Sequence, residues 1–165
     1  TETSTVNFDA GEFVPNGAIV ELSTTGALCV YASTPTHVAL DLAGAVPANA
    51  TLATAAPSRL LDTRLDGGPL AAGRSIEVQV TGQVDVPADA IGAIVNVATV
   101  GPAAPGYLTV WPCDSAPTTS SVNNATAGIV RANNAVVPLS PRGTLCVFTL
   151  TDTDVILDIT AWLTP

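Results

Sequence analysis

Five charged residues are the first candidates for chemistry, because charged side chains make up only 12% of this sequence. Arg59, Asp62 and Arg64 lie close together in the chain, and Asp41 and Asp158 occupy matching places within two apolar segments. A carboxylate that is buried in such a segment must be paired or hydrogen-bonded. The pattern therefore predicts an internal ion-pair network among these five residues. The functional alternative is that the two arginines bind a carboxylate or sulfate ligand.

Catalytic chemistry has few candidates. His37 is the only histidine, so a Ser-His-Asp triad would have to use it, and the G-x-S-x-G turn of α/β hydrolases is absent. Spacing singles out no pair of carboxylates for glycoside hydrolysis. Asp152, Asp154 and Asp158 could offer oxygen ligands to calcium, but we expect a solvated turn instead. We predict that the chain is not an enzyme and has no catalytic residues, no cofactor and no metal site.

A binding surface is the remaining possibility. Tyr107, Thr109 and Trp111 alternate along the chain, so they point to one side of a predicted strand. An exposed Tyr/Trp face can stack on a sugar ring or anchor a protein contact. These three residues are the candidate ligand-binding residues. The alternative is that Trp111 packs in the core.

Charge limits the partners. The net charge is −9 and the five cations are all arginines, so the chain cannot neutralise the phosphates of a nucleic acid. An anionic membrane surface is disfavoured for the same reason. No run of roughly 18 apolar residues occurs, so we expect no membrane insertion.

The elements that position these residues occur twice. We call residues 127–163 the C-terminal copy and residues 10–46 the N-terminal copy. With an offset of 117, 15 of the 36 positions from Gly11 to Val46 are identical to those of the C-terminal copy. The shared pattern is strand, turn, strand, turn, strand.

The composition predicts an all-β fold. Apolar residues are mainly Ala, Val, Leu and Ile, and thirteen Gly and thirteen Pro divide them into about twelve short strands without a helix. An antiparallel two-sheet β-sandwich fits best, and a pseudo-threefold barrel of the trefoil kind is the alternative. The N-terminal strands are expected at Ala18–Leu22, Ala27–Tyr31 and His37–Leu42, after a short strand around Val6. Ile91–Val100 and Tyr107–Trp111 are expected to form a hairpin.

The domain prediction follows from the size of the chain. At 165 residues it is long enough for one core and short for two. We expect a single β domain made of a half-repeat (1–46), a linker (47–57) and a full repeat (58–165). The half-repeat should pack alongside the full one, since three short strands bury too little apolar area to be stable alone.

Ordered motifs in residues 57–163 resemble a known family. They are PSRLLDTR from Pro57, GPLAAG from Gly68, VPADA from Val86, GYLTVWP from Gly106 and TDVILDI from Thr153. Together they resemble the P-x-R-L-L-D-T-R repeat modules of large secreted and surface proteins of bacteria. The usual Gly-Tyr-Phe ending is Ala-Trp-Leu here. The resemblance implies an extracellular β module, supplies no catalytic residues, and makes residues 10–46 similar to the closing half of a preceding repeat.

Three cysteines bear on the compartment. Cys113 follows a predicted strand end and Cys146 lies in the following predicted hairpin, so we expect a disulfide between them. Cys29 is then a buried thiol, forms an intermolecular bond, or replaces Cys113 in a bond to Cys146. Together with a start at Thr1 rather than at Met, the cysteines favour a processed, secreted protein on the extracellular surface.

The predicted function is a non-catalytic extracellular adhesion or binding module, with a cell-surface glycan or protein as its target. The first alternative is a self-associating structural subunit, in which further copies of the chain pair to form a surface stalk or fibre. The second is an accessory domain of a secreted hydrolase.

Overall fold

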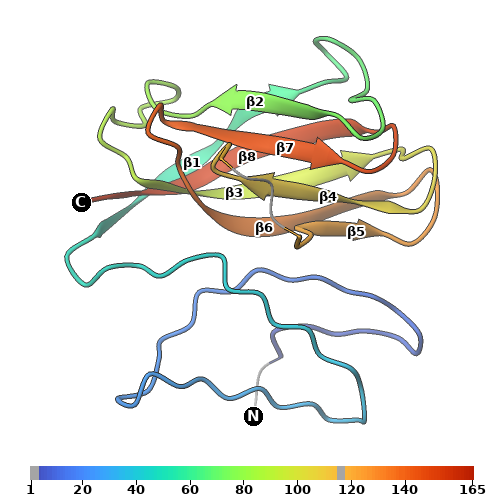
Figure 1. Ribbon diagram of the computed structural model, residues 1–165, viewed down its shortest axis with the longest axis horizontal. Coiled ribbons are helices and arrows are strands. Elements are labelled where there is room, and N and C mark those ends of the chain that lie inside the picture. Colours follow the sequence, from blue (N-terminus) through green and yellow to red (C-terminus); the bar gives the residue numbers. More distant parts are fainter. Residues whose placement is uncertain (1–3, 115–117) are drawn as a thin grey trace.

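The computed structural model describes residues 4–114 and 118–165, and the regular structure in these ranges is entirely β-strand. Eight strands form in the described part of the chain, and all of them follow residue 50 (Figure 1). Their bounds are β1 Thr51–Asp62, β2 Ser75–Gln79, β3 Gly92–Val100, β4 Gly106–Trp111, β5 Val122–Asn124, β6 Val130–Pro138, β7 Thr144–Thr149 and β8 Asp154–Thr164.

The strands form two antiparallel sheets of four strands each. The order is β1-β8-β3-β6 in the first sheet and β2-β7-β4-β5 in the second. Figure 1 shows the two sheets stacked face to face. The predicted two-sheet β-sandwich is confirmed. The trefoil-like barrel is wrong because the two sheets remain separate.

The core between the sheets consists of aliphatic side chains. In β8, Val155, Leu157 and Ile159 are fully buried, whereas the residues between them are only partly buried. Leu145 of β7 and Leu108 of β4 join the same cluster from the other sheet. Burying each such side chain contributes about 1.5–3 kcal/mol, so hydrophobic burial is the main force that holds the sheets together.

Most connections pass from one sheet to the other. Only β4 and β5 are consecutive strands that pair within one sheet. The predicted hairpin of Ile91–Val100 with Tyr107–Trp111 is therefore wrong, since β3 and β4 lie in different sheets. A turn that contains glycine at positive φ, such as Gly101 at +62°, permits either geometry. The local sequence alone does not decide between them.

Residues 51–57, which were expected to belong to the linker 47–57, form the first part of strand β1. Its pairing with β8 shifts register between Thr54 and Ser58, around Pro57, which has no N–H to donate. A second shift follows between Arg59 and Leu61. Between these irregularities Arg59 lies directly opposite Asp158 of β8.

Residues 4–50 contain no strand, so the strands expected around Val6 and at Ala18–Leu22, Ala27–Tyr31 and His37–Leu42 do not form. The C-terminal copy forms its three strands because β1, β2, β3 and β4 pair with them. The described residues form one set of such partner strands, and the C-terminal copy pairs with it.

The N-terminal copy also stays outside the core. Every buried side chain of the described residues lies between residues 62 and 163. We expected residues 1–46 to share a core with residues 58–165, but in the structure the described part of this segment has no buried side chain. In Figure 1 this segment runs as an open trace beside the sandwich, on the side of β5 and β6.

Candidate functional site

The predicted ion-pair network forms at the end of β1. Arg59 bonds to Asp158 across the strand pair and to Asp62 further along its own strand. Arg64 donates from Nε to Asp62 Oδ1 over 2.8 Å and from Nη2 to Oδ2 over 2.6 Å. Asp41 lies outside the network, in the exposed N-terminal copy, so this part of the prediction is wrong.

The electrostatics of the network favour a structural role. Hydrogen bonds from Arg64 are the main cause that lowers the pKa of Asp62 to about 2, and the charge of Arg59 acts in the same direction. The hydrogen bond to Asp158 raises the pKa of Arg59, and that to Asp62 raises the pKa of Arg64. Arg59, Asp62 and Arg64 are therefore held in their charged forms and are already paired, which favours a structural role over general acid–base catalysis.

The network also fixes the turn after β1. Besides the side chain of Arg64, the Asp62 carboxylate accepts the backbone N–H of that residue over 3.2 Å. Thr63 donates its hydroxyl to Asp154 Oδ1 over 2.8 Å and accepts the N–H of Val155 over 2.9 Å. These bonds tie the end of β1 to the start of β8. The sequence motif around Leu60–Arg64 thus holds the turn after β1 against the start of β8.

The three aspartates considered for calcium do not share a site. Asp152 Oδ1 accepts the backbone N–H of Ala72 over 2.7 Å, Asp154 bonds to Thr63, and Asp158 bonds to Arg59. Among residues 4–114 and 118–165, no group of His, Cys, Asp or Glu could hold a metal ion.

The predicted ligand-binding face of β4 is largely covered. Trp111 is only 7% exposed and Thr109 only 3%. Thr109 donates its hydroxyl to the carbonyl of Thr119 over 2.8 Å, where the chain runs beside β4 as it leads into β5. Tyr107 is partly buried, with its ring centroid 5.9 Å from that of Phe148. The three side chains therefore do not form an exposed stacking platform, and the alternative of a packed Trp111 is the one observed.

A disulfide joins Cys113 to Cys146, as the sequence predicts, with 4.9 Å between the Cα atoms. It connects the end of β4 to β7 within one sheet. Closing a loop with a sequence separation of 33 contributes roughly 3–4 kcal/mol of stability. Cys29 is free and exposed, so the alternatives of a buried thiol and of a Cys29–Cys146 bond are both wrong.

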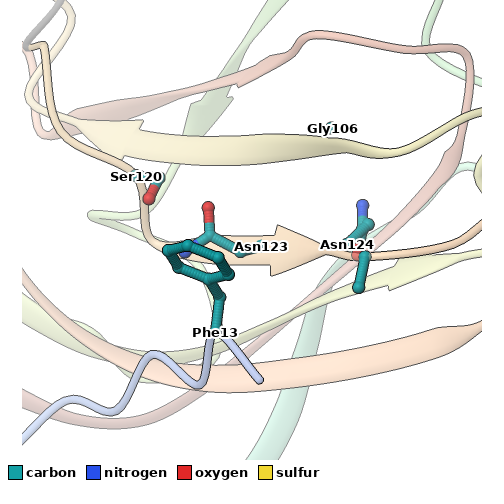
Figure 2. A pocket seen from close by; sticks show the side chains of 6 residues that line it. Phe13, Gly106, Ser120, Asn123 and Asn124 are labelled. Atoms are coloured by element: carbon teal, nitrogen blue, oxygen red, sulfur yellow. The ribbon is translucent and has the colours of Figure 1, made fainter. Parts of the chain in front are cut away.

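A shallow depression lies where the N-terminal copy passes the edge strand β5. Figure 2 shows the ring of Phe13 beside Asn123, with Asn124 further along the same strand. Gly106, Ser120 and Ala125 complete the lining. None of these six residues has a titratable side chain. The depression therefore offers no general acid or base, and no base that could activate the Ser120 hydroxyl.

The most unusual surface of the protein is the N-terminal copy itself. Apart from Val14, Pro15 and Gly17, every residue from 11 to 46 is exposed. The large apolar side chains that face solvent in this copy are Phe13, Ile19, Val20, Leu22, Leu28, Val30, Tyr31, Val38, Leu40, Leu42 and Val46. Monomeric proteins rarely expose apolar residues in such density, and those that do usually use them for contacts.

Few bonds fasten the N-terminal copy to the sandwich. The backbone N–H of Gly17 donates to Asn133 Oδ1 over 3.1 Å, and Glu12 lies 3.6 Å from Arg131. Gly17 approaches β6 so closely that a Cβ atom there would lie 2.1 Å from the carbonyl oxygen of Asn134. These contacts lie along β6, with Phe13 beside β5, and they leave most of the apolar side chains exposed.

The two copies nevertheless share a turn. In the N-terminal copy, Ser23 N donates to the Ala27 carbonyl over 2.9 Å, and Ser23 Oγ accepts the N–H of Ala27 over 3.1 Å. In the C-terminal copy, Ser140 N donates to the Thr144 carbonyl over 2.9 Å, and Ser140 Oγ accepts the N–H of Thr144 over 3.2 Å. The glycine of each turn has nearly the same φ, +75° at Gly26 and +71° at Gly143. The repeat is therefore structural at its turn, although only one copy forms strands.

Comparison with known proteins gives no relative: no family model, no curated protein and no solved structure matches the chain. No helix in residues 4–114 and 118–165 is long and apolar enough to cross a membrane.

The exposed apolar surface is the feature that sequence reasoning missed. The repeat is visible in the sequence, but the sequence predicts that its strands join the core. A count of strands could have revealed the exposed surface. The sequence repeats the segment that forms β6–β8, whereas the strands that pair with this segment appear once in the described residues.

Proposed function

We propose that the chain is a non-catalytic interaction module of an extracellular surface protein, and that the N-terminal copy makes its principal contact with another protein. The observation that carries the proposal is the row of exposed apolar side chains between Phe13 and Val46. Several of their counterparts in the C-terminal copy, such as Leu157 and Val155, are fully buried. Side chains that suit a core and face solvent favour a protein partner over a glycan.

Three further features support this role. The Cys113–Cys146 disulfide suits an oxidising, extracellular environment. The Asp62 carboxylate is paired with arginine side chains within the fold, so it is not free to act as an acid or base on a substrate. The buried Trp111 weakens the case for a sugar-stacking face on β4.

The test is attachment of the fluorescently labelled chain to cells of the organism that makes it. One sample of cells is stripped of surface protein with protease, and another has its surface glycans oxidised with periodate. We expect attachment to disappear after protease and to survive periodate.

A matched pair of variants locates the contact. Leu40→Asp introduces a charge where the C-terminal copy has the buried Leu157, whereas Ala39→Asp matches the partly buried Ile156. Leu40→Asp should reduce attachment at least tenfold and Ala39→Asp should leave it unchanged. Attachment that survives protease and disappears after periodate would assign a glycan target instead. Failure of the chain to attach to untreated cells would remove the adhesion role.

A further inference from the structure

The environment of the C-terminal copy defines what the N-terminal copy lacks. In the folded repeat, β8 lies between β1 and β3, β7 lies between β2 and β4, and β6 pairs with β3. The strands β1–β4 therefore provide every partner of β6, β7 and β8. The same three strands are encoded in residues 10–46, with 15 identities in 36 positions and with the same turn at Ser23–Ala27.

The side chains that differ most in exposure are those at matched core positions. Leu28, Val38 and Leu40 are 41%, 57% and 67% exposed. Their identical counterparts Leu145, Val155 and Leu157 are each 0% exposed. Identical residues at identical repeat positions thus have opposite environments. At these three positions the copies differ in the strands around them and not in residue type.

We propose that residues 10–46 are the β6–β8 half of a second sandwich, which is completed by a separate unit of the β1–β5 kind. This inference rests on the proposed role of the N-terminal copy as the interacting segment and names the partner of that segment. The partner is a protein segment with strands equivalent to β1, β2, β3 and β4, whose inner faces carry small aliphatic residues. It would enclose the N-terminal copy as residues 51–124 enclose the C-terminal copy.

A second copy of this chain does not fit as the partner. In residues 4–114 and 118–165, each chain has two segments of the β6–β8 kind and one β1–β5 unit. If two chains exchanged halves, each N-terminal copy that gained a partner would displace a C-terminal copy, and the number of uncovered halves would stay the same. The exchange gains no buried area, so the missing unit must come from an additional segment.

Cys29 supplies a specific chemical marker for the proposal. It matches Cys146, which is bonded to Cys113 at the end of β4. Cys29 is free and exposed in this structure. A completing unit with a cysteine equivalent to Cys113 would bring its thiol next to Cys29. In the presence of oxidised glutathione, the two thiols would give up two protons and two electrons to form the disulfide, and the glutathione disulfide would be reduced to two thiols.

The experiment adds the missing unit to the whole chain. A duplicate of residues 51–117 is fused to the N-terminus at Thr1, which keeps the repeat in register because Thr1 aligns with Thr118 at the same offset. The extended chain is oxidised with glutathione and compared with the natural chain by amide hydrogen exchange and by peptide mapping without reductant. We expect the amides of residues 18–42 to exchange roughly a hundredfold more slowly, or slower still, in the extended chain. We also expect Cys29 to be bonded to the added Cys113.

The matched variants serve again as controls. In the extended chain, Leu40→Asp should abolish the protection and leave Cys29 reactive toward iodoacetamide, whereas Ala39→Asp should preserve both effects. Unchanged exchange in residues 18–42, together with a reactive Cys29, would overturn the proposal. A natural chain that dimerises and protects its own N-terminal copy would overturn the choice of partner in favour of a second copy.

Failure of this inference is distinguishable from failure of the proposed function. Protease-sensitive attachment to cells without protection in the extended chain would leave the interaction role standing and remove only the named partner. Protection in the extended chain without attachment to cells would mean that the segment completes a neighbouring repeat and does not act as an adhesive surface.

Discussion

Replacing Leu157 by alanine should strongly destabilise the sandwich, and the same change at Leu40 should not. Leu157 is 0% exposed in the centre of the core, whereas Leu40, its identical counterpart in the N-terminal copy, is 67% exposed. A buried Leu→Ala change costs about 2.7–5 kcal/mol, because it removes transfer free energy and leaves a cavity. An exposed change usually stays within about 0.5 kcal/mol. Since residue type and repeat position are the same, the comparison isolates the effect of the partner strands.

The assay is urea unfolding followed by tryptophan fluorescence, which reports on the buried Trp111 and on Trp162 packed against the core. Leu157→Ala should lower the free energy of unfolding by about 3 kcal/mol, which for a folded unit of this size corresponds to a fall in Tm of roughly 10 °C. Leu40→Ala should leave both quantities nearly unchanged. A loss above about 1 kcal/mol at Leu40 would show that this side chain is packed, because exposed surface changes are usually smaller. A loss below about 1 kcal/mol at Leu157 would also contradict the structure, because buried Leu→Ala changes cost much more than this.

Three further predictions concern the sandwich. Cys113→Ser should lower the free energy of unfolding by roughly 3 kcal/mol under oxidising conditions and have no effect in reductant, as measured by urea titration. The ion pairs of Asp62 lower its pKa from 3.8 to about 2, so their stabilisation is complete above about pH 4 and is lost as the pH falls toward 2. Asp62→Asn should therefore lower stability at neutral pH and flatten its dependence on pH in this window; an unchanged acid profile would contradict the assignment. Gly143→Ala should destabilise by about 2 kcal/mol or more, because its φ is +71° and a Cβ atom would lie 1.9 Å from Thr81 Oγ1. Gly26→Ala, at +75° with nothing within 4 Å, should leave global stability unchanged, and thermal melts of both variants make the comparison.

Much of the sandwich could be predicted from local patterns. The branched apolar run Val155–Ile159, interrupted by Asp158, favours a strand at β8, in which Val155, Leu157 and Ile159 share the buried face. Arg59 and Asp158 could be paired from the rule that a charge inside an apolar strand needs a partner. Local charge and periodicity are sufficient for these features.

The arrangement of the strands in sheets could not be predicted in the same way. The Gly101–Gly106 connection has the composition of a hairpin loop, yet it carries the chain from β3 in one sheet to β4 in the other. Turn chemistry fixes the backbone angles at the glycine and says nothing of which strands then pair. Pairing is decided by the total apolar area buried, which is a property of the whole fold.

The N-terminal copy shows the same limit more sharply. Val38 and Leu40 have the residue types and the alternation of a buried strand, and their C-terminal counterparts form one. A strand needs a hydrogen-bonded neighbour as well as a suitable sequence, and that neighbour is outside the local pattern. The burial of Thr109 has a similar cause, because its hydroxyl bonds to the carbonyl of Thr119, which lies outside the strand itself.

Amide hydrogen exchange on the natural chain compares the N-terminal copy with the C-terminal copy directly, without any substitution. The amides of residues 135–159 lie in or between the paired strands β6–β8, and those of residues 18–42 lie in an exposed segment without strands. We expect exchange that is slower by roughly a thousandfold or more at the strand amides of the C-terminal copy than at the matched amides of the N-terminal copy. Equal protection of the two copies would mean that their environments are the same, contrary to the structure described above.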